Sequence, residues 1–193
     1  MNFLAHLHLS CSDDLLLTGN FLADMLSLRE MERLPPEYKK GIQLHRLIDT
    51  YTDNNADVKL VNQKLYPYVG KYAPVASDVL FDYFLAKNWD KLYHLSLVDF
   101  TKKVYEIIRR NIHVAPAQTQ ILVNKMIEDN FLLKYTHFEG LRFVFDKMNK
   151  RARFNVNFND ALLVLEKDED FIDIHFKKFY SDLLSEVKVF CSC

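Results

Sequence analysis

The chain has 193 residues, with 25 Lys and Arg against 26 Asp and Glu, so its formal net charge is -1. A chain of this length is expected to fold as one domain, residues 1–193, with a sizeable core. The near-zero charge gives no global reason to expect a nucleic-acid partner, and a 49% hydrophobic composition with only four glycines argues against disorder.

Cysteine content and hydropathy indicate the compartment. The three cysteines, Cys11, Cys191 and Cys193, match neither a disulfide framework nor a metal motif, so we expect a reducing compartment, most simply the cytoplasm. The first residues carry no basic leader, and no apolar run is long enough to span a bilayer. We therefore expect neither export nor a membrane partner.

The first predicted element is a helix in the segment LAHLHL. Its apolar residues and histidines alternate as in a strand, but the segments that follow have helical periodicity. On a helix, at about 100° per residue, His6 and His8 point in nearly opposite directions, so only one of them can serve a single site. The next helical segment, GNFLADML, carries Asn20 and Asp24.

A helix in the segment GIQLHRLIDTYTDNN has an apolar stripe with a polar row beside it. The stripe has the i, i+3, i+4, i+7 spacing of a buried surface and consists of Leu44, Leu47, Ile48 and Tyr51. His45, Asp49 and Asp53 follow an i, i+4, i+8 row along its flank. Charged groups at such a border are costly to desolvate unless they pair with each other, with the neighbouring Arg46 or with a metal ion.

The segment SDVLFDYF repeats the i, i+4 spacing with Asp78 and Asp82 inside a strongly apolar helix, where an unpaired carboxylate is expensive. Further helical periodicity covers residues 58–69, 75–89, 97–110, 119–135 and 171–187. Helix breaks are predicted at Pro35, Pro36, Pro67, Gly70, Pro74, Pro116, Gly140 and the Asn-rich segment 154–160. The pattern predicts an all-α protein, a compact bundle of about eight helices.

Histidines and carboxylates recur across the first half of the chain. Singly, each has a structural explanation: a buried histidine, a helix cap or an i, i+4 salt bridge such as His45 with Asp49. Jointly they match a site for a divalent cation such as Mn²⁺, Mg²⁺ or Fe²⁺, without the thiolates typical of structural zinc. Such a site favours phosphoester hydrolysis, because the ion polarises a phosphoryl oxygen and Arg46 could clamp the remaining phosphate charge.

Four segments carry a resemblance to a known family: MNFLAHLHLS, TGNFLADML, GIQLHRLIDTYTDNN and APVASDVLFDYFLAKNW. In this order and near these positions they resemble the acyl carrier protein phosphodiesterase family, also called acyl carrier protein hydrolyase. The match is close over about the first 90 residues, continues more weakly in residues 122–154, and is slight beyond them.

The resemblance implies a helical fold related to the HD-domain metal-dependent phosphohydrolases. It also implies Mn²⁺-dependent hydrolysis of the phosphodiester that joins 4'-phosphopantetheine to the serine of holo acyl carrier protein. Carried over position by position, the metal and catalytic set is Asp24, His45, Asp49, Asp78 and Asp82, with His6 as a further metal ligand and Arg46 as a phosphate contact.

Two features depart from the pattern that the resemblance implies. Tyr83 follows Asp82, where family members commonly have His, and a tyrosine is a poor base at neutral pH. The chain also has no adjacent His-Asp dipeptide, the mark of the wider HD superfamily. The exact ligands are therefore left open within the cluster.

An acidic carrier protein needs a basic docking surface on this nearly neutral chain. The candidates are Arg151 and Arg153, then Arg109 and Arg110. Two other functions remain open: a metal-dependent phosphohydrolase of a small phosphoester or nucleotide, and a helical interaction module without activity, in which His45 pairs with Asp49. The sequence leaves the oligomeric state open.

Overall fold

The computed structural model describes residues 1–10 and 13–191, with side chains up to residue 188. The described residues form eleven α-helices: α1 (Phe3–His8), α2 (Asp14–Ala23), α3 (Leu28–Glu32), α4 (Pro36–Asn54), α5 (Ala56–Val69), α6 (Ala73–Lys87), α7 (Trp89–Leu92), α8 (Leu97–Asn111), α9 (Ala117–Glu128), α10 (Phe138–Asn149) and α11 (Asp160–Cys191). Three 3₁₀ helices join them: η1 (Gly70–Tyr72), η2 (Ile112–Val114) and η3 (Phe131–Thr136). The predicted all-α class is confirmed, and the described helices outnumber the expected eight because α3, α7 and α10 were not predicted as separate helices. The side chains of all three cysteines lie outside the described set.

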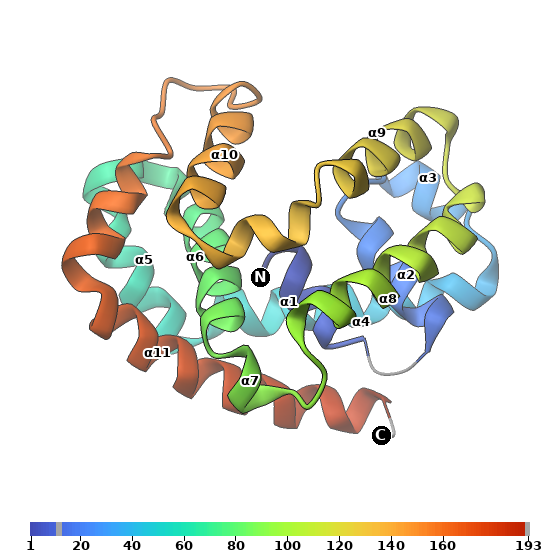
Figure 1. Cartoon of the computed structure of the whole chain (residues 1–193), viewed down its shortest axis with the longest axis horizontal. Helices are drawn as coiled ribbons and strands as arrows, with labels where there is room; N and C mark the ends of the chain where they lie inside the picture. The colour runs from blue at the N-terminus through green and yellow to red at the C-terminus, as the bar shows by residue number, and fades with distance from the viewer. Residues whose placement is uncertain (11–12, 192–193) are drawn as a thin grey trace.

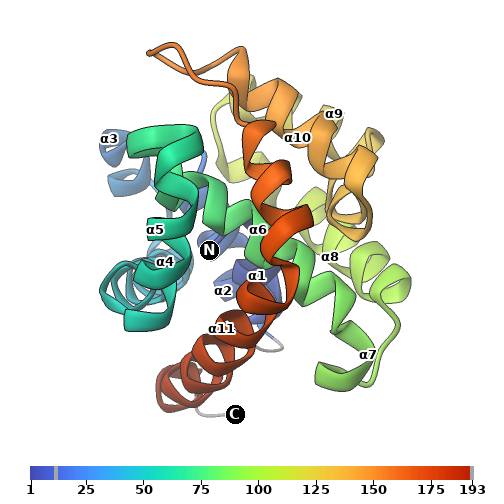
Figure 2. The same cartoon turned by 90° about the vertical axis from the view of Figure 1, so that its left-hand side faces the viewer.

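The short helix α1 lies in the middle of the molecule, packed against α2 and α6, and α4 crosses beside α2 (Figure 1). The long helix α11 runs beside α5 and also contacts α6 (Figure 2). Phe81 of α6 stacks on Phe179 of α11, with ring centroids 5.5 Å apart. Aromatic burial of this kind holds α6 in place and with it the helix α1 that packs on its other side.

The apolar stripe predicted on α4 is confirmed. Leu44 and Ile48 are fully buried, and Leu47 and Tyr51 pack against the core. His45, at the border of this stripe, is also buried. Burial of the stripe thus fixes which way the polar row faces.

Three helix limits differ from the prediction. Residues 119–135 do not form one helix, because Asn130 adopts a left-handed conformation (φ 51°) that separates α9 from η3. Pro67 lies inside the last turn of α5, where its fixed φ suits a helix, and the helix ends at Gly70 with φ 56° instead. Gly140 does not break α10 but lies in its first turn, where an added Cβ would come within 2.0 Å of the Lys134 carbonyl oxygen.

No helix in the described part of the chain combines the length and the apolar character needed to cross a bilayer.

Candidate metal centre

Helix α1 brings His6 to the site, and its N-terminus is doubly fixed. The Asn2 side chain accepts a hydrogen bond from the amide of Phe3 at 3.0 Å. The two carboxylate oxygens of Asp82, on α6, accept the amides of Leu4 at 2.8 Å and Ala5 at 3.1 Å. These bonds satisfy amides that the first turn of a helix leaves free, so the position of His6 is set by α6 as well as by its own helix.

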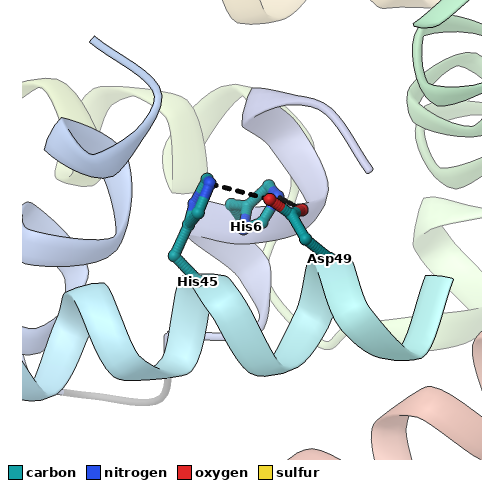
Figure 3. A group of neighbouring side chains, drawn as sticks. All are labelled: His6, His45 and Asp49. Atoms are coloured by element: carbon teal, nitrogen blue, oxygen red, sulfur yellow. Dashed lines mark ion pairs between the residues drawn. The ribbon is translucent and has the colours of Figure 1, made fainter. Parts of the chain in front are cut away.

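Helix α4 contributes His45 and Asp49, one turn apart, and they meet His6 from α1 (Figure 3). Nε2 of His45 lies 3.0 Å from one carboxylate oxygen of Asp49, and Nε2 of His6 lies 3.2 Å from the other. The two imidazole rings stack with centroids 4.2 Å apart. Asp24, directly after α2, lies 3.6 Å from Nε2 of His45. The structure therefore brings together four of the predicted residues.

The buried side chain of Asn20, on α2, links the two histidines. Its Oδ1 lies 2.9 Å from Nδ1 of His6 and 3.2 Å from Nδ1 of His45. Its Nδ2 donates to the carbonyl of His6 and to Oγ of Ser10, both at 2.8 Å, which fixes the orientation of the amide. Because Oδ1 can only accept, both Nδ1 atoms carry hydrogen. Each Nε2 is then the atom left to bind a proton or a cation.

The charges in this group are mutually dependent. Burial raises the pKa of Asp49, but its contacts with His45 and His6 outweigh burial and hold that pKa well below its usual range. Burial lowers the pKa of His45, but the hydrogen bond with Asp49 and the charge of Asp24 outweigh it and raise that pKa. The group thus holds a carboxylate anion directly opposite two imidazole nitrogens.

This donor set fits a divalent metal ion. His6, His45 and Asp49 each offer one ligand atom, and these atoms lie within 4.8 Å of one another. Nε2 of His6 is buried, and its polar neighbour is the Asp49 oxygen at 3.2 Å, which does not meet it with hydrogen-bond geometry. Two imidazoles and a carboxylate are a common ligand set for first-row metals, and they leave coordination positions open for water and substrate.

Asp78 and Asp82 lie outside this group. Asp78 accepts a hydrogen bond at 2.9 Å from the amino group of Met1. Both oxygens of Asp82 are engaged by the α1 amides described above, and burial raises the pKa of Asp82 to about 8. Asp82 thus supports the helix that carries His6.

Three further residues of the first half face away from the metal group. His8 lies within hydrogen-bonding distance of the Tyr180 hydroxyl (2.7 Å), as expected if only one of the two α1 histidines serves the site. Asp53 is exposed at the end of α4. The hydroxyl of Tyr83 donates to Glu169 of α11 and takes no part in the metal group.

A cavity of about 420 Å³ adjoins the group through Asp24. Residues of α6, α9, η3 and α10 line it, together with Met1, Asn2 and Phe3 at the start of α1. Its lining is mainly apolar, and four cations also line it: Lys125, Lys134, Lys147 and Arg151. We call it the α9–α10 pocket.

The predicted docking arginines are dispersed. Arg151 lines the α9–α10 pocket, and Arg153 is exposed in the loop after α10. Arg109 is exposed on α8, and Arg110 on the same helix pairs with Asp14 at 3.0 Å. Arg46 is exposed and forms no ion pair within the described part of the chain.

Sequence reasoning noted Asn20 but did not assign it to the site, and it missed Tyr135, Lys125 and Lys134. Tyr135 is buried and lines the pocket, and burial together with the charges of Asp82 and Asp24 raises its pKa well above the ordinary value. Its phenol therefore stays protonated and can donate a hydrogen bond. Spacing gave no signal for these residues, because the pocket forms only where α9, η3 and α10 come together.

Comparison with known proteins identifies the family. The family described as acyl carrier protein phosphodiesterase matches residues 1–183. Proteins named acyl carrier protein phosphodiesterase from Escherichia coli O45:K1 and O127:H6 are each 30% identical over 188 residues, covering 96% of this chain and 97% of theirs. A third protein of this name, from Escherichia coli O139:H28, is 29% identical with the same coverage of both chains. No solved structure matches the chain significantly, so the relation to HD-domain proteins stays a prediction. The chain belongs to the acyl carrier protein phosphodiesterase family, a family of phosphodiester hydrolases.

Proposed function

We propose that this chain hydrolyses the phosphodiester between 4'-phosphopantetheine and the serine of holo acyl carrier protein, with a divalent metal ion. The observation that carries the proposal is the convergence of His6, His45 and Asp49 near the α9–α10 pocket, in a chain of this family. The products are apo acyl carrier protein and free 4'-phosphopantetheine. We propose Mn²⁺ as the ion, with Mg²⁺ and Fe²⁺ as alternatives that the same ligands accept.

His6 and His45, through Nε2, and Asp49, through its carboxylate, would hold the ion. When bound, the ion supplies Lewis-acid polarisation of the phosphoryl group and lowers the pKa of a water molecule. Asn20 accepts from Nδ1 of both rings and so leaves each Nε2, on the side of Asp49, as the nitrogen that would bind the ion. The pKa of His45 is raised by the hydrogen bond with Asp49 and the charge of Asp24, so metal binding through its Nε2 would compete with protonation of the ring.

Asp24 is placed to act on the attacking water. Its carboxylate reaches both the metal group, 3.6 Å from Nε2 of His45, and the wall of the pocket. We assign it the role of orienting the water and accepting its proton. The water oxygen bonds to phosphorus, the bond from phosphorus to the serine oxygen breaks, and the serine oxygen takes up a proton. Arg46 is the proposed contact of the remaining phosphate charge.

The basic side chains near the pocket support an acidic protein substrate. Arg151 lines the α9–α10 pocket, and Arg153 is exposed in the loop that follows α10. Arg109 and Arg110, on α8, are the weaker candidates because Arg110 is already paired with Asp14.

Mass spectrometry of holo acyl carrier protein tests the proposal directly. Incubation with this protein and Mn²⁺ is expected to remove the phosphopantetheine mass, and a chelator is expected to prevent the loss. Asp49→Ala is expected to abolish the reaction, whereas Asp53→Ala, one turn further along the same helix and exposed, is expected to leave it unchanged.

Retention of the phosphopantetheine mass by a metal-loaded protein would refute this substrate. Turnover of small phosphoesters under the same conditions would then identify a different phosphohydrolase. Equal metal binding by the Asp49→Ala and Asp53→Ala variants would refute the metal centre itself.

A further inference from the structure

We infer that the α9–α10 pocket binds the pantetheine arm of the substrate, so that the enzyme recognises the prosthetic group itself and not only the protein that carries it. This inference rests on the proposed function. It adds a binding site for a specific part of the substrate.

The first support is continuity between the pocket and the metal group. Asp24 lies 3.6 Å from Nε2 of His45 and also forms part of the pocket wall. A phosphodiester bound at the metal group has one substituent leading to the carrier protein and one leading to the pantetheine arm. The arm is long, slender and uncharged, and the adjoining pocket gives it a place to extend.

The second support is the size and character of the pocket. Its volume of about 420 Å³ lies in the range of roughly 300–1,000 Å³ that is typical of small-ligand sites. Val79 of α6, Leu122 and Met126 of α9 and Val144 of α10 supply apolar walls suited to the methyl and methylene groups of the arm. The protonated phenol of Tyr135 is a hydrogen-bond donor for an amide carbonyl of the arm.

The third support is the charge of the lysines and the arginine that line the pocket. Lys147 pairs with Asp129 at 2.9 Å, and Lys134 lies over the ring of Phe143, with its Nζ 5.1 Å from the ring centroid. Lys125 and Arg151 are exposed and have no ion pair within the described residues. Three carboxylates share the lining, and two of them, Asp78 and Asp129, are paired with the Met1 amino group and Lys147. The unpaired charges of Lys125 and Arg151 suit an acidic protein that presents the arm, and a neutral metabolite would gain nothing from them.

Equilibrium binding to the metal-free, chelated protein tests the inference without catalysis. We expect holo acyl carrier protein to bind roughly tenfold or more tightly than the apo form, because only the holo form buries the arm. Leu122→Trp, which fills the pocket, is expected to remove this preference while leaving apo binding unchanged. Ile121→Trp is the matched control, since Ile121 is the preceding residue, 65% exposed and outside the pocket lining.

Val75→Trp is a second pocket-filling variant, which keeps the test valid if Leu122→Trp does not fold. Val75 lines the pocket from α6 but is 43% exposed, so a larger side chain there does not disturb the core. Equal binding of holo and apo carrier protein to the unmodified chain would overturn the inference, as would a retained preference in both pocket-filling variants.

The binding test separates the two proposals. An arm-dependent preference without hydrolysis on addition of Mn²⁺ would uphold the pocket and refute the proposed reaction. Hydrolysis without an arm-dependent preference would uphold the reaction and refute the pocket.

Discussion

Asn20 offers one carboxamide oxygen to two imidazole rings, and this arrangement has a testable consequence. Asn20→Leu removes the acceptor of both Nδ1–H groups, so neither ring keeps a fixed tautomer or orientation. We expect metal affinity to fall by about 10–100-fold, the usual effect of removing such an outer contact. Metal titration measures the affinity, and nitrogen chemical shifts of the imidazoles measure the tautomers.

Asn20→Asp separates the roles of this side chain. It keeps an acceptor for both rings but loses the donors to the His6 carbonyl and to Ser10. It should therefore retain the Nδ1–H tautomers that Asn20→Leu loses, at some cost in stability. Unchanged tautomers and metal affinity in Asn20→Leu would contradict the assignment.

The comparison of Asn20 with Asp49 shows what spacing can predict about a site. The i, i+4 relation of His45 and Asp49 is a property of one helix, so the sequence was enough to pair them. The contact of Asn20 with His6 and His45 joins three helices, and nothing in the local pattern specifies it. The same reasoning explains Asp82, whose spacing suggested a ligand but whose oxygens bind α1 amides.

At the scale of helices, α1 depends on a carboxylate from another helix. Asp82→Asn replaces one accepting oxygen with an NH₂ group, which cannot accept a hydrogen bond. One backbone N–H at the start of α1, that of Leu4 or Ala5, therefore loses its acceptor. We expect the free energy of unfolding to fall by about 1–3 kcal/mol. Chemical denaturation measures this loss.

Metal titration of Asp82→Asn shows whether Asp82 only supports helix α1 or also binds the metal ion. If Asp82 only supports α1, the metal affinity of folded Asp82→Asn should fall far less than that of Asp49→Ala. Equal losses in the two variants would show that Asp82 is itself a ligand.

Close packing of α2 and α4 sets the distance between Asn20 and His45. Gly41 of α4 faces α2, and an added Cβ would lie 2.3 Å from the Leu16 carbonyl oxygen and 2.6 Å from the Asn20 amide nitrogen. Gly41→Ala must push the helices apart, and we expect it to reduce stability by about 1–3 kcal/mol or more. Metal affinity should fall with it, because the two helices carry opposite sides of the site.

Gln43→Ala, on the exposed side of the same helix, is the control for this substitution. Denaturation and metal titration of both variants test the expectation. A Gly41→Ala protein with unchanged stability and affinity would show that the helices can separate without disturbing the site.

Helix prediction succeeded where one helix buries one apolar stripe, as in α4. It failed where tertiary structure decides the backbone. Asn130 ends α9 in a left-handed conformation, and Gly140 allows α10 to approach the carbonyl of Lys134. Glycine spacing therefore marked close contacts between elements as well as breaks.

Two segments far apart in the chain meet where the long helix α11 runs beside α5 (Figure 2). A buried carboxylate, Asp57, joins these helices. Asp57, in the first turn of α5, lies 2.7 Å from Nδ1 of His175 and 3.2 Å from Nζ of Lys178, both on α11. Burial raises the pKa of Asp57, but these two partners outweigh it and lower the pKa below the ordinary value of 3.8. The folded protein therefore binds this proton less readily than the unfolded chain.

The lowered pKa of Asp57 determines how the free energy of unfolding changes with pH. The contribution of Asp57 to stability is fully present above its ordinary pKa and is lost as the pH falls through the lowered pKa of the folded state. Asp57→Asn removes the charge at every pH, so it should cost about 1–3 kcal/mol near neutral pH and progressively less below about pH 4. Urea denaturation of both proteins across this range measures the difference, and a cost that stays constant down to pH 2 would show that the ionised carboxylate does not hold α11 to α5.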